Sequence, residues 1–317
     1  MAKRPRIALV MGDPAGVGPE MAVKLLSREA NLAAADIQLI APHSVLARGE
    51  EIAGTKLDLG RIAHRVQRET GAAPMGQCTA AAGATVLEAL TAATDLAKDG
   101  IVDAILFAPM NKHSLRLAGM DEEDELRYMQ KRFGVKDFVC EFNITDNLWT
   151  SRVTSHVPLR EVADLITPQA VDEAVRIIDR ALRRAGIPKP RVAVSGLNPH
   201  AGDGGSIGME EIEVIAPAVE KLKRAGIDAS GPWSPDTVFI AARRGDFDAV
   251  VSMYHDQGQI AMKIMGFERG VTLHGGLPIP VATSASGSAF DIAGRNVARI
   301  EGLQAAFDLC VRMAAAA

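Results

Sequence analysis

Short apolar runs alternate along the chain with longer stretches in which apolar positions recur at helical spacing. The apolar runs hold five or six residues, a length typical of the buried strands of a parallel sheet. We expect such strands at residues 6–11, 37–41, 104–109, 191–196 and 248–253.

Three stretches between those runs predict helices, at residues 80–100, 168–186 and 208–226. Each finishes at a glycine after a basic or mixed-charge turn, which is typical of a helix C-terminus. The alternation of strand and helix predicts an α/β protein with a doubly wound sheet.

Polar and glycine-rich segments follow four of the predicted strands. They cover residues 12–20, 110–113, 197–206 and 254–258. Ligands of open α/β sheets bind beyond the carboxyl ends of the strands. The arrangement therefore favours one composite site over scattered structural polar groups.

Composition excludes several classes of protein. A net charge of −4, from 35 basic and 39 acidic residues, gives no electrostatic footprint for nucleic acid. No apolar run reaches the roughly 18 residues that span a bilayer, and the N-terminal run is too short for a signal peptide. Three distant cysteines fit neither a disulfide framework nor a cysteine-based zinc site. At 317 residues the chain exceeds a usual single domain, and we expect two domains or one large α/β unit in a cytoplasmic protein.

Three histidines lie in loops beside proline, glycine or a carboxylate: His156, His200 and His255. Three neutral imidazoles would hold a divalent metal and leave coordination positions open for a substrate. A lone histidine is more often a packed or surface residue, and the wide spacing does not prove convergence. The residues alone leave both interpretations open. His43, His64 and His113 lack such a context.

Asp203 and Asp256 are candidates to orient the neighbouring imidazoles. Loop aspartates equally often satisfy local backbone N–H groups. Residues 12–20 follow a strand and open a helix, where free N–H groups attract anions, but they match neither G-x-G-x-x-G nor a P-loop. The small residues of 284–296 would admit a cofactor or simply allow tight helix packing.

Six motifs occur in the order seen in the 4-hydroxythreonine-4-phosphate dehydrogenase family, which the chain resembles over nearly its whole length. They are GDPAGVGPE (12–20), PMNK (109–112), SHVPLREV (155–162), GLNPHAGDGGSIGMEE (196–211), GPWSPDTVF (231–239) and MYHDQGQIAMKIMGFERGV (253–271). The segments NPHAG and YHDQG carry the most specific part of the resemblance.

The resemblance implies a metal- and NAD-dependent dehydrogenase that oxidises a secondary alcohol and then decarboxylates the product. It implies two α/β/α domains of the isocitrate/isopropylmalate dehydrogenase type. Residues 1–125 with 266–317 would form the first domain and residues 126–265 the second. It also implies a homodimer with shared active sites.

Site residues follow from the same resemblance. His156, His200 and His255 fall on the metal-ligand positions, with zinc expected and cobalt, nickel or manganese as alternatives. Lys263 falls on a substrate-binding lysine, and Asp236 on an aspartate near substrate and metal. The implied cofactor-binding residues are Gly287, Ser288, Asp291 and Gly294.

Four positions depart from the phosphate-binding pattern of the family: Glu125, Leu126, Thr272 and Val281. They lack the donors or the positive charge that hold a phosphate, although Arg127 or His274 could compensate. The departures favour a non-phosphorylated substrate such as a cis-dihydrodiol carboxylate of the terephthalate type. The alternative is the vitamin B6 reaction on 4-hydroxythreonine 4-phosphate.

Two other classes stay open as alternatives. Acyl-phosphate transferases share a related fold without using NAD, but the three histidines and SGSAFDIAG (286–294) argue against that class. A non-catalytic ligand-binding protein is disfavoured by the retained metal positions and Lys263.

Overall fold

The computed structural model describes residues 4–316 and consists of two compact units. Unit 1 combines the two ends of the chain, Met1–Asp137 and Val271–Ala317, and unit 2 comprises Phe138–Gly270. The two-domain α/β organisation predicted from the sequence is therefore present.

The boundaries lie further along the chain than the expected breaks at 125/126 and 265/266. Helix α6 stays with unit 1 because it packs on helix α4: Thr91 and Tyr128 share a hydroxyl hydrogen bond of 2.7 Å, and Arg132 Nε donates to Thr94 Oγ1 at 3.0 Å. Residues 266–270 stay with unit 2, where Arg269 forms an ion pair with Asp146 at 3.1 Å.

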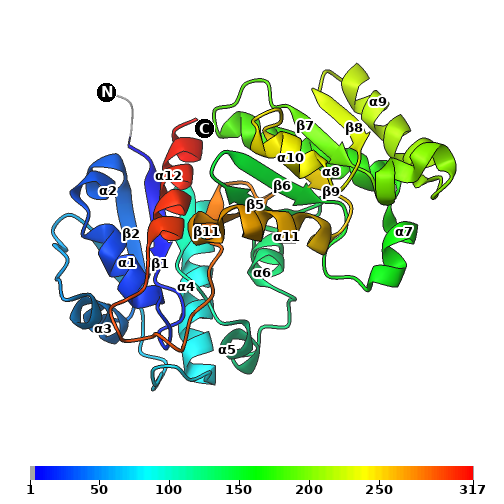
Figure 1. Ribbon diagram of the computed structural model, residues 1–317. Helices are drawn as coiled ribbons and strands as arrows, with labels where there is room; N and C mark the ends of the chain where they lie inside the picture. Colours follow the sequence, from blue (N-terminus) through cyan, green and yellow to red (C-terminus); the bar gives the residue numbers. More distant parts are fainter. Residues whose placement is uncertain (1–3, 317) are drawn as a thin grey trace. The chain divides into compact units, whose positions relative to one another are not determined.

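Unit 1 is a six-stranded sheet with helices around it (Figure 1). Its strands run in the order β3-β2-β1-β4-β11-β10; the β10–β11 pair is antiparallel, and the pairs β3–β2, β2–β1, β1–β4 and β4–β11 are parallel. Helix α12, in red, lies beside β11. The elements are β1 (Arg6–Val10), α1 (Gly18–Leu26), α2 (Glu29–Ala34), β2 (Asp36–Ala41), α3 (His43–Ala53), β3 (Ala63–Val66), α4 (Ala80–Lys98), β4 (Ala104–Phe107), α5 (Lys112–Leu117), α6 (Glu125–Phe133), β10 (Val271–Gly275), β11 (Val281–Ser284) and α12 (Glu301–Ala315).

Unit 2 is a five-stranded sheet in the order β5-β6-β9-β7-β8, antiparallel only between β5 and β6. The elements are β5 (Cys140–Thr145), β6 (Leu148–Arg152), η1 (Leu159–Glu161), α7 (Val162–Leu165), α8 (Pro168–Arg184), β7 (Val192–Ser195), η2 (Pro199–Gly205), η3 (Glu211–Ile215), α9 (Ala216–Arg224), β8 (Ala229–Trp233), α10 (Val238–Arg243), β9 (Ala249–Ser252), α11 (His255–Gly266) and η4 (Phe267–Arg269).

Helices cover both faces of the unit 2 sheet. Ala193 and Val250 join a buried cluster with the apolar side chains of α10 and α11. Successive strand residues point to opposite faces, so the neighbouring strand positions are available to α8, which packs against β5, β6, β7 and β9. The side-chain oxygen of Thr167 caps α8 by accepting a hydrogen bond from Ala170 N at 3.2 Å.

All five predicted strands are present, and the predicted helices at 80–100 and 168–186 correspond to α4 and α8. The stretch 208–226 differs, since it begins with a π-helical turn, η3, and becomes α-helical only at Ala216. Pro217 cannot donate a hydrogen bond to the preceding turn, which explains why the regular helix starts there. In residues 4–316 no helix combines the length and the apolar character needed to cross a membrane.

Candidate active site

Each unit has a point where the chain reverses the direction in which it adds strands, and such points are the usual ligand sites of open α/β sheets. In unit 1 this point lies between β1 and β4, which are adjacent and parallel. The loops that follow them meet there: Asp13 N donates to Pro109 O at 2.9 Å. Two of the four polar segments expected from the sequence therefore lie together.

The glycines of the loop 12–20 serve close packing. A Cβ on Gly12 would lie 2.4 Å from Pro109 O, and one on Gly16 would lie 2.6 Å from Ser288 O. All residues from Met11 to Val23 are buried. The loop is therefore a closed packing element in unit 1, not an open anion cradle.

The segment 284–296 is bonded to both loops of unit 1. Ser288 O accepts a hydrogen bond from Val17 N at 3.0 Å, and Asn111 Nδ2 donates to Ser288 Oγ at 3.3 Å. Ser288 is buried, whereas Gly287, Asp291 and Gly294 are exposed. Three of the four residues expected to bind the cofactor are thus accessible in unit 1, and the fourth anchors the segment.

In unit 2 the reversal lies between β7 and β9. The loops after these strands are joined by Gln257, whose Nε2 donates to Gly196 O at 2.9 Å while its Oε1 accepts from Met253 N at 2.7 Å. The segments 197–206 and 254–258 therefore start side by side, and they carry His200 and His255.

His156 and His255 lie together in a geometry that suits a shared cation. Their ring centroids are 5.6 Å apart with planes inclined by 45°. An ion held about 2.1 Å from each imidazole nitrogen in tetrahedral geometry would place the two centroids about 5 Å apart. The observed separation of the two rings is therefore close to that of a metal-bridged pair.

Asp256 orients the His255 ring. Its Oδ1 lies 2.6 Å from His255 Nδ1, which leaves Nε2 as the nitrogen available to a metal. A carboxylate on the second ring nitrogen is the usual partner of a metal-bound histidine. Asp203 behaves differently, because its carboxylate accepts a local hydrogen bond from Ser206 Oγ at 3.0 Å.

His200 lies in a loop whose backbone is left-handed over several residues. The φ angles of His200, Ala201 and Asp203 are 55°, 52° and 44°, a conformation that costs about 1–2 kcal/mol for each residue other than glycine. In the part of the chain that the structure describes, the ring nitrogens of His156, His200 and His255 do not all lie within 4.8 Å of one another. The structure thus pairs His156 with His255, and His200 as third ligand stays a prediction.

Asp236 lies within electrostatic reach of His200. A hydrogen bond of 2.7 Å from Ser234 Oγ is the main cause that lowers the pKa of Asp236, and the charge of His200 contributes in the same direction. This fully exposed carboxylate is therefore held in its ionised form beside one candidate ligand.

Glu211 was not singled out by the sequence reasoning, yet it organises the His200 loop. It is 1% exposed, and its Oε1 accepts hydrogen bonds from Leu197 N and Asn198 N, both at 2.7 Å. Its Oε2 accepts from Asn198 Nδ2 at 2.9 Å. The only signal in the sequence is the acidic pair Glu210 and Glu211 after a glycine-rich loop. This pattern does not reveal that Glu211 accepts hydrogen bonds from residues that precede the loop.

The four positions expected to define the substrate pocket differ in accessibility within unit 1. Val281 is 0% exposed in the middle of the sheet, Leu126 is 2% exposed, and Glu125 is 7% exposed in the first turn of α6. Thr272 is half-buried on β10. Val281 and Leu126 therefore pack in the core of unit 1. Their apolar character is explained by this packing and does not by itself indicate a non-phosphorylated substrate.

Lys263 is exposed on α11, eight residues after His255. This spacing corresponds to about 12 Å along the helix axis. The two residues considered as compensating donors are both engaged: Arg127 Nη1 donates to Gln130 Oε1 at 3.0 Å, and His274 packs on Phe107 with centroids 5.5 Å apart.

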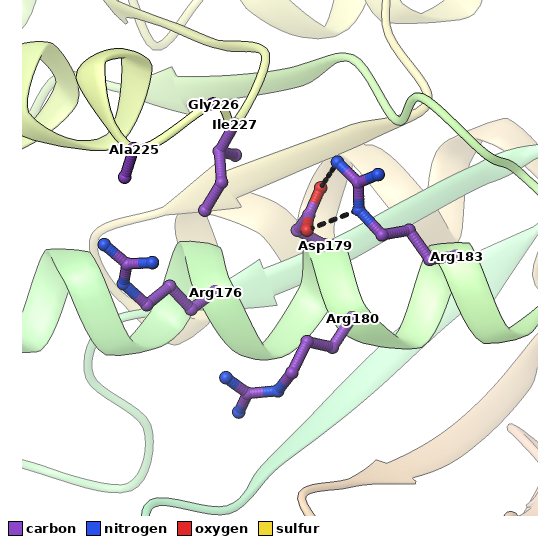
Figure 2. A pocket seen from close by; sticks show the side chains of 7 residues that line it. All are labelled: Arg176, Asp179, Arg180, Arg183, Ala225, Gly226 and Ile227. Atoms are coloured by element: carbon purple, nitrogen blue, oxygen red, sulfur yellow. Dashed lines mark hydrogen bonds and ion pairs between the residues drawn. The ribbon is translucent and has the colours of Figure 1, made fainter.

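Unit 2 also has a pocket of about 330 Å³ on α8 and the turn after α9. Figure 2 shows that its three guanidinium groups do not converge, since those of Arg176 and Arg180 point to different sides of α8. The guanidinium group of Arg183 donates two hydrogen bonds to the carboxylate of Asp179. None of the candidate catalytic residues lines this pocket. Its lining consists of Arg176, Asp179, Arg180, Arg183, Ala225, Gly226 and Ile227.

Comparison with known proteins gives a consistent family. Residues 9–310 match the family model described as pyridoxal phosphate biosynthetic protein PdxA. A Pseudomonas aeruginosa protein named "Putative 4-hydroxythreonine-4-phosphate dehydrogenase 2" is 49% identical over 98% of this chain and 97% of its own length. D-threonate 4-phosphate dehydrogenase of Salmonella typhimurium is 36% identical over 97% and 98%.

Solved structures agree with this. A 4-hydroxythreonine-4-phosphate dehydrogenase from Klebsiella pneumoniae aligns with a TM-score of 0.85 and 34% identity over 99% of each chain. A terephthalate 1,2-cis-dihydrodiol dehydrogenase from Burkholderia xenovorans aligns with a TM-score of 0.69 and 28% identity over 95% and 96%. A β-decarboxylating dehydrogenase from Thermococcus kodakarensis, at a TM-score of 0.54 and 15% identity over 96% and 81%, shares the fold alone.

Proposed function

The chain belongs to the pyridoxal phosphate biosynthetic protein PdxA family, whose named relatives are dehydrogenases, and from this premise we propose that it is a metal- and NAD-dependent dehydrogenase of a hydroxyacid. The observation that carries the metal part is the facing pair His156 and His255, with Asp256 on the remaining ring nitrogen of His255. His200 would complete the ligand set.

The residues of the chain have separable roles in this proposal. His156, His200 and His255 would hold the cation, and Asp256 keeps the ring of His255 turned toward it. Lys263, which is exposed on α11, offers an ammonium group to a substrate anion or to a proton in transit. When bound, the cation supplies Lewis-acid polarisation of a substrate oxygen and NAD supplies a hydride acceptor.

Decarboxylation after oxidation is part of the same proposal. A ketone formed β to a carboxylate loses carbon dioxide readily when the developing negative charge is stabilised. The ionised Asp236 beside His200 would keep that imidazole in place during the change of charge. The cofactor would lie against the accessible residues of the 284–296 segment.

For the substrate we favour a phosphorylated four-carbon hydroxyacid. Relatives at 36% and 49% identity are named for substrates with a 4-phosphate, whereas the dihydrodiol dehydrogenase is 28% identical. Two of the four positions that favoured a non-phosphorylated acid lie in the core of unit 1. The comparisons therefore do not favour the dihydrodiol expectation.

One observation keeps a non-phosphorylated acid as the second candidate. Asp124 and Glu125 place two carboxyl groups at the start of α6, where phosphate-binding members of the family carry a Gly-His pair. A negative charge there would repel a phosphate dianion. The two candidates predict opposite results with a panel of acids.

The test combines metal titration with NADH absorbance on 4-phosphohydroxythreonine, D-threonate 4-phosphate and a cis-dihydrodiol carboxylate. We expect turnover of a phosphorylated acid with a kcat on the order of 1 per second or more. We expect His156→Ala and His255→Ala to weaken metal binding by at least about 100-fold, while the control His64→Ala in unit 1 leaves it unchanged. Metal binding that survives both site variants would refute the proposal.

The homodimer expected from the sequence stays a prediction. It is supported by exposed apolar side chains on unit 2, among them Met209 (42%), Ile212 (48%) and Ile264 (81%). Exposed apolar side chains mark a contact surface where they form one contiguous patch. Sedimentation of the intact chain would measure its assembly state.

A further inference from the structure

Two side chains clamp the start of the His200 loop, and neither belongs to the residues that would touch metal, substrate or cofactor. Gln257 Nε2 donates to Gly196 O at 2.9 Å. Glu211 Oε1 accepts from Leu197 N and Asn198 N, both at 2.7 Å. Two consecutive peptide groups, 196–197 and 197–198, are thus held by side chains from two different helical elements, shortly before the left-handed residues.

The geometry points to Glu211 and Gln257 as positioning residues that fix the His200 loop relative to the start of α11. This inference rests on the proposed function, because it assigns their purpose to the metal site. Gln257 lies two residues after His255, and Gly196 lies four residues before His200. The hydrogen bond between them therefore joins a side chain two residues from one candidate ligand to the backbone four residues before another.

The chemistry of both side chains matches the groups that they meet. Glu211 faces only N–H donors, and an ionised carboxylate accepts through both oxygens. Gln257 meets one donor, Met253 N, and one acceptor, Gly196 O, so only an amide satisfies both. A glutamine at 211 would turn an NH₂ group toward N–H donors, and an apolar residue at 257 would leave both backbone partners unbonded.

The glycines of the motif make room for this clamp. A Cβ on Gly202 would lie 2.7 Å from Glu211 Oε2, and a Cβ on Gly208 would lie 2.5 Å from Asn198 Nδ2. The loop thus folds closely over a carboxylate that is 1% exposed. Unfavourable backbone conformations such as those of His200 and Ala201 persist only where surrounding bonds determine them, and this clamp supplies those bonds.

The test uses the intact chain and the variants Glu211→Gln and Gln257→Met. Matched controls are Glu213→Gln in the same π-helical turn, where the side chain is exposed, and Gln259→Met on α11, whose amide donates to Asn143 Oδ1 and not to the His200 loop. Three quantities are measured: affinity for Co²⁺ by competition titration, the visible spectrum of the bound Co²⁺, and amide hydrogen exchange of residues 196–205 in the metal-free chain.

Loss of the clamp is expected to weaken Co²⁺ binding by about 10- to 100-fold, the usual effect of removing a group that orients a ligand. The Co²⁺ spectrum is expected to change, and exchange at 196–205 to accelerate, while both controls behave as the wild type. A residue with a merely structural role would lower the unfolding temperature without changing the spectrum of the folded fraction.

Wild-type affinity and spectrum in either folded variant would overturn the inference. Should Glu211→Gln fail to fold, Gln257→Met alone decides, because that side chain is only half-buried. A wild-type chain that binds no Co²⁺ would overturn both this inference and the proposed function. Binding by the wild type and by both variants alike would overturn this inference only.

Discussion

Asp13 keeps a carboxyl group at a position that is 0% exposed, and within the described residues its Oδ2 has no hydrogen-bond partner. Burial is the main cause that raises the pKa of Asp13, because a low-dielectric environment disfavours the charged form. The folded state consequently holds this proton more tightly than the unfolded state does. The stability associated with Asp13 is complete below the unfolded-state pKa and is lost as pH rises through the raised folded-state pKa.

Replacing Asp13 with asparagine is therefore expected to raise the free energy of unfolding, relative to wild type, more at high pH than at low pH. Between about pH 4 and pH 8 the free energy of unfolding of Asp13→Asn should gain on the order of 1 kcal/mol relative to wild type. Urea unfolding at the two pH values measures this. The exposed Asp164→Asn serves as control, and an equal pH dependence in both variants would contradict the prediction.

The residue scale also shows where sequence reasoning succeeds. Asp256 could be proposed as the partner of His255 because the two are adjacent in the chain, and the structure places them 2.6 Å apart. Glu211 could not, because its partners lie 13 and 14 residues away across a left-handed loop. The buried position of Val281 was equally hidden, since a valine suits either a pocket wall or a sheet core.

At the scale of elements, the packing of the loop 12–20 against the segment 284–296 predicts that Gly16 and Gly287 differ in how well they tolerate an added methyl group. Gly16→Ala would force a methyl group to within 2.6 Å of Ser288 O, whereas a Cβ on Gly287 meets nothing within 4 Å. We expect Gly16→Ala to lower the free energy of unfolding by about 1–3 kcal/mol, as overpacking does, and Gly287→Ala to leave it nearly unchanged. Denaturant titration of both variants tests this, and similar losses would show that packing is not the cause.

Elements with uniformly apolar patterns were predictable, and those whose buried positions are polar were not. Strand β6 is buried at every position, yet it contains Thr150, Ser151 and Arg152. Arg152 donates a hydrogen bond to Asn143 Oδ1 at 3.0 Å and forms an ion pair with Glu141 at 3.1 Å, and the sequence pattern does not predict either partner. The antiparallel pairs β5–β6 and β10–β11 join strands that are neighbours in the sequence, and they escaped prediction because these strands mix polar with apolar residues.

At the scale of the whole molecule, the candidate ligands of the metal and those of the cofactor belong to different units. His156, His200 and His255 lie in unit 2, and Gly287, Ser288, Asp291 and Gly294 lie in unit 1. The sequence predicts the same division, and the roles of both sets of residues stay predictions. The sequence pattern did not place α6 with the first part of the chain, because the contacts of α6 with α4 depend on tertiary packing.

Ligand binding should therefore protect the units separately. A ligand present at 100 times its Kd stabilises the form that binds it by about 2.7 kcal/mol. We expect a divalent metal to slow hydrogen exchange mainly in residues 138–270, and NAD to slow it mainly around 284–296 and the loops that contact this segment. Exchange with each ligand alone measures the two patterns, and metal protection confined to unit 1 would contradict the assignment of the histidines.

The discontinuous course of unit 1 has a consequence during synthesis. Strand β11 lies between β4 and β10, so the β4 edge of the early-made part remains unpaired until residues 281–284 have left the ribosome. Unit 2, which is continuous, is complete before that moment. A nascent chain thus carries an open, apolar sheet edge in its first-made part and a finished unit 2 after it, and the time at which residues 281–284 emerge affects whether that edge pairs with its own strand or with another chain.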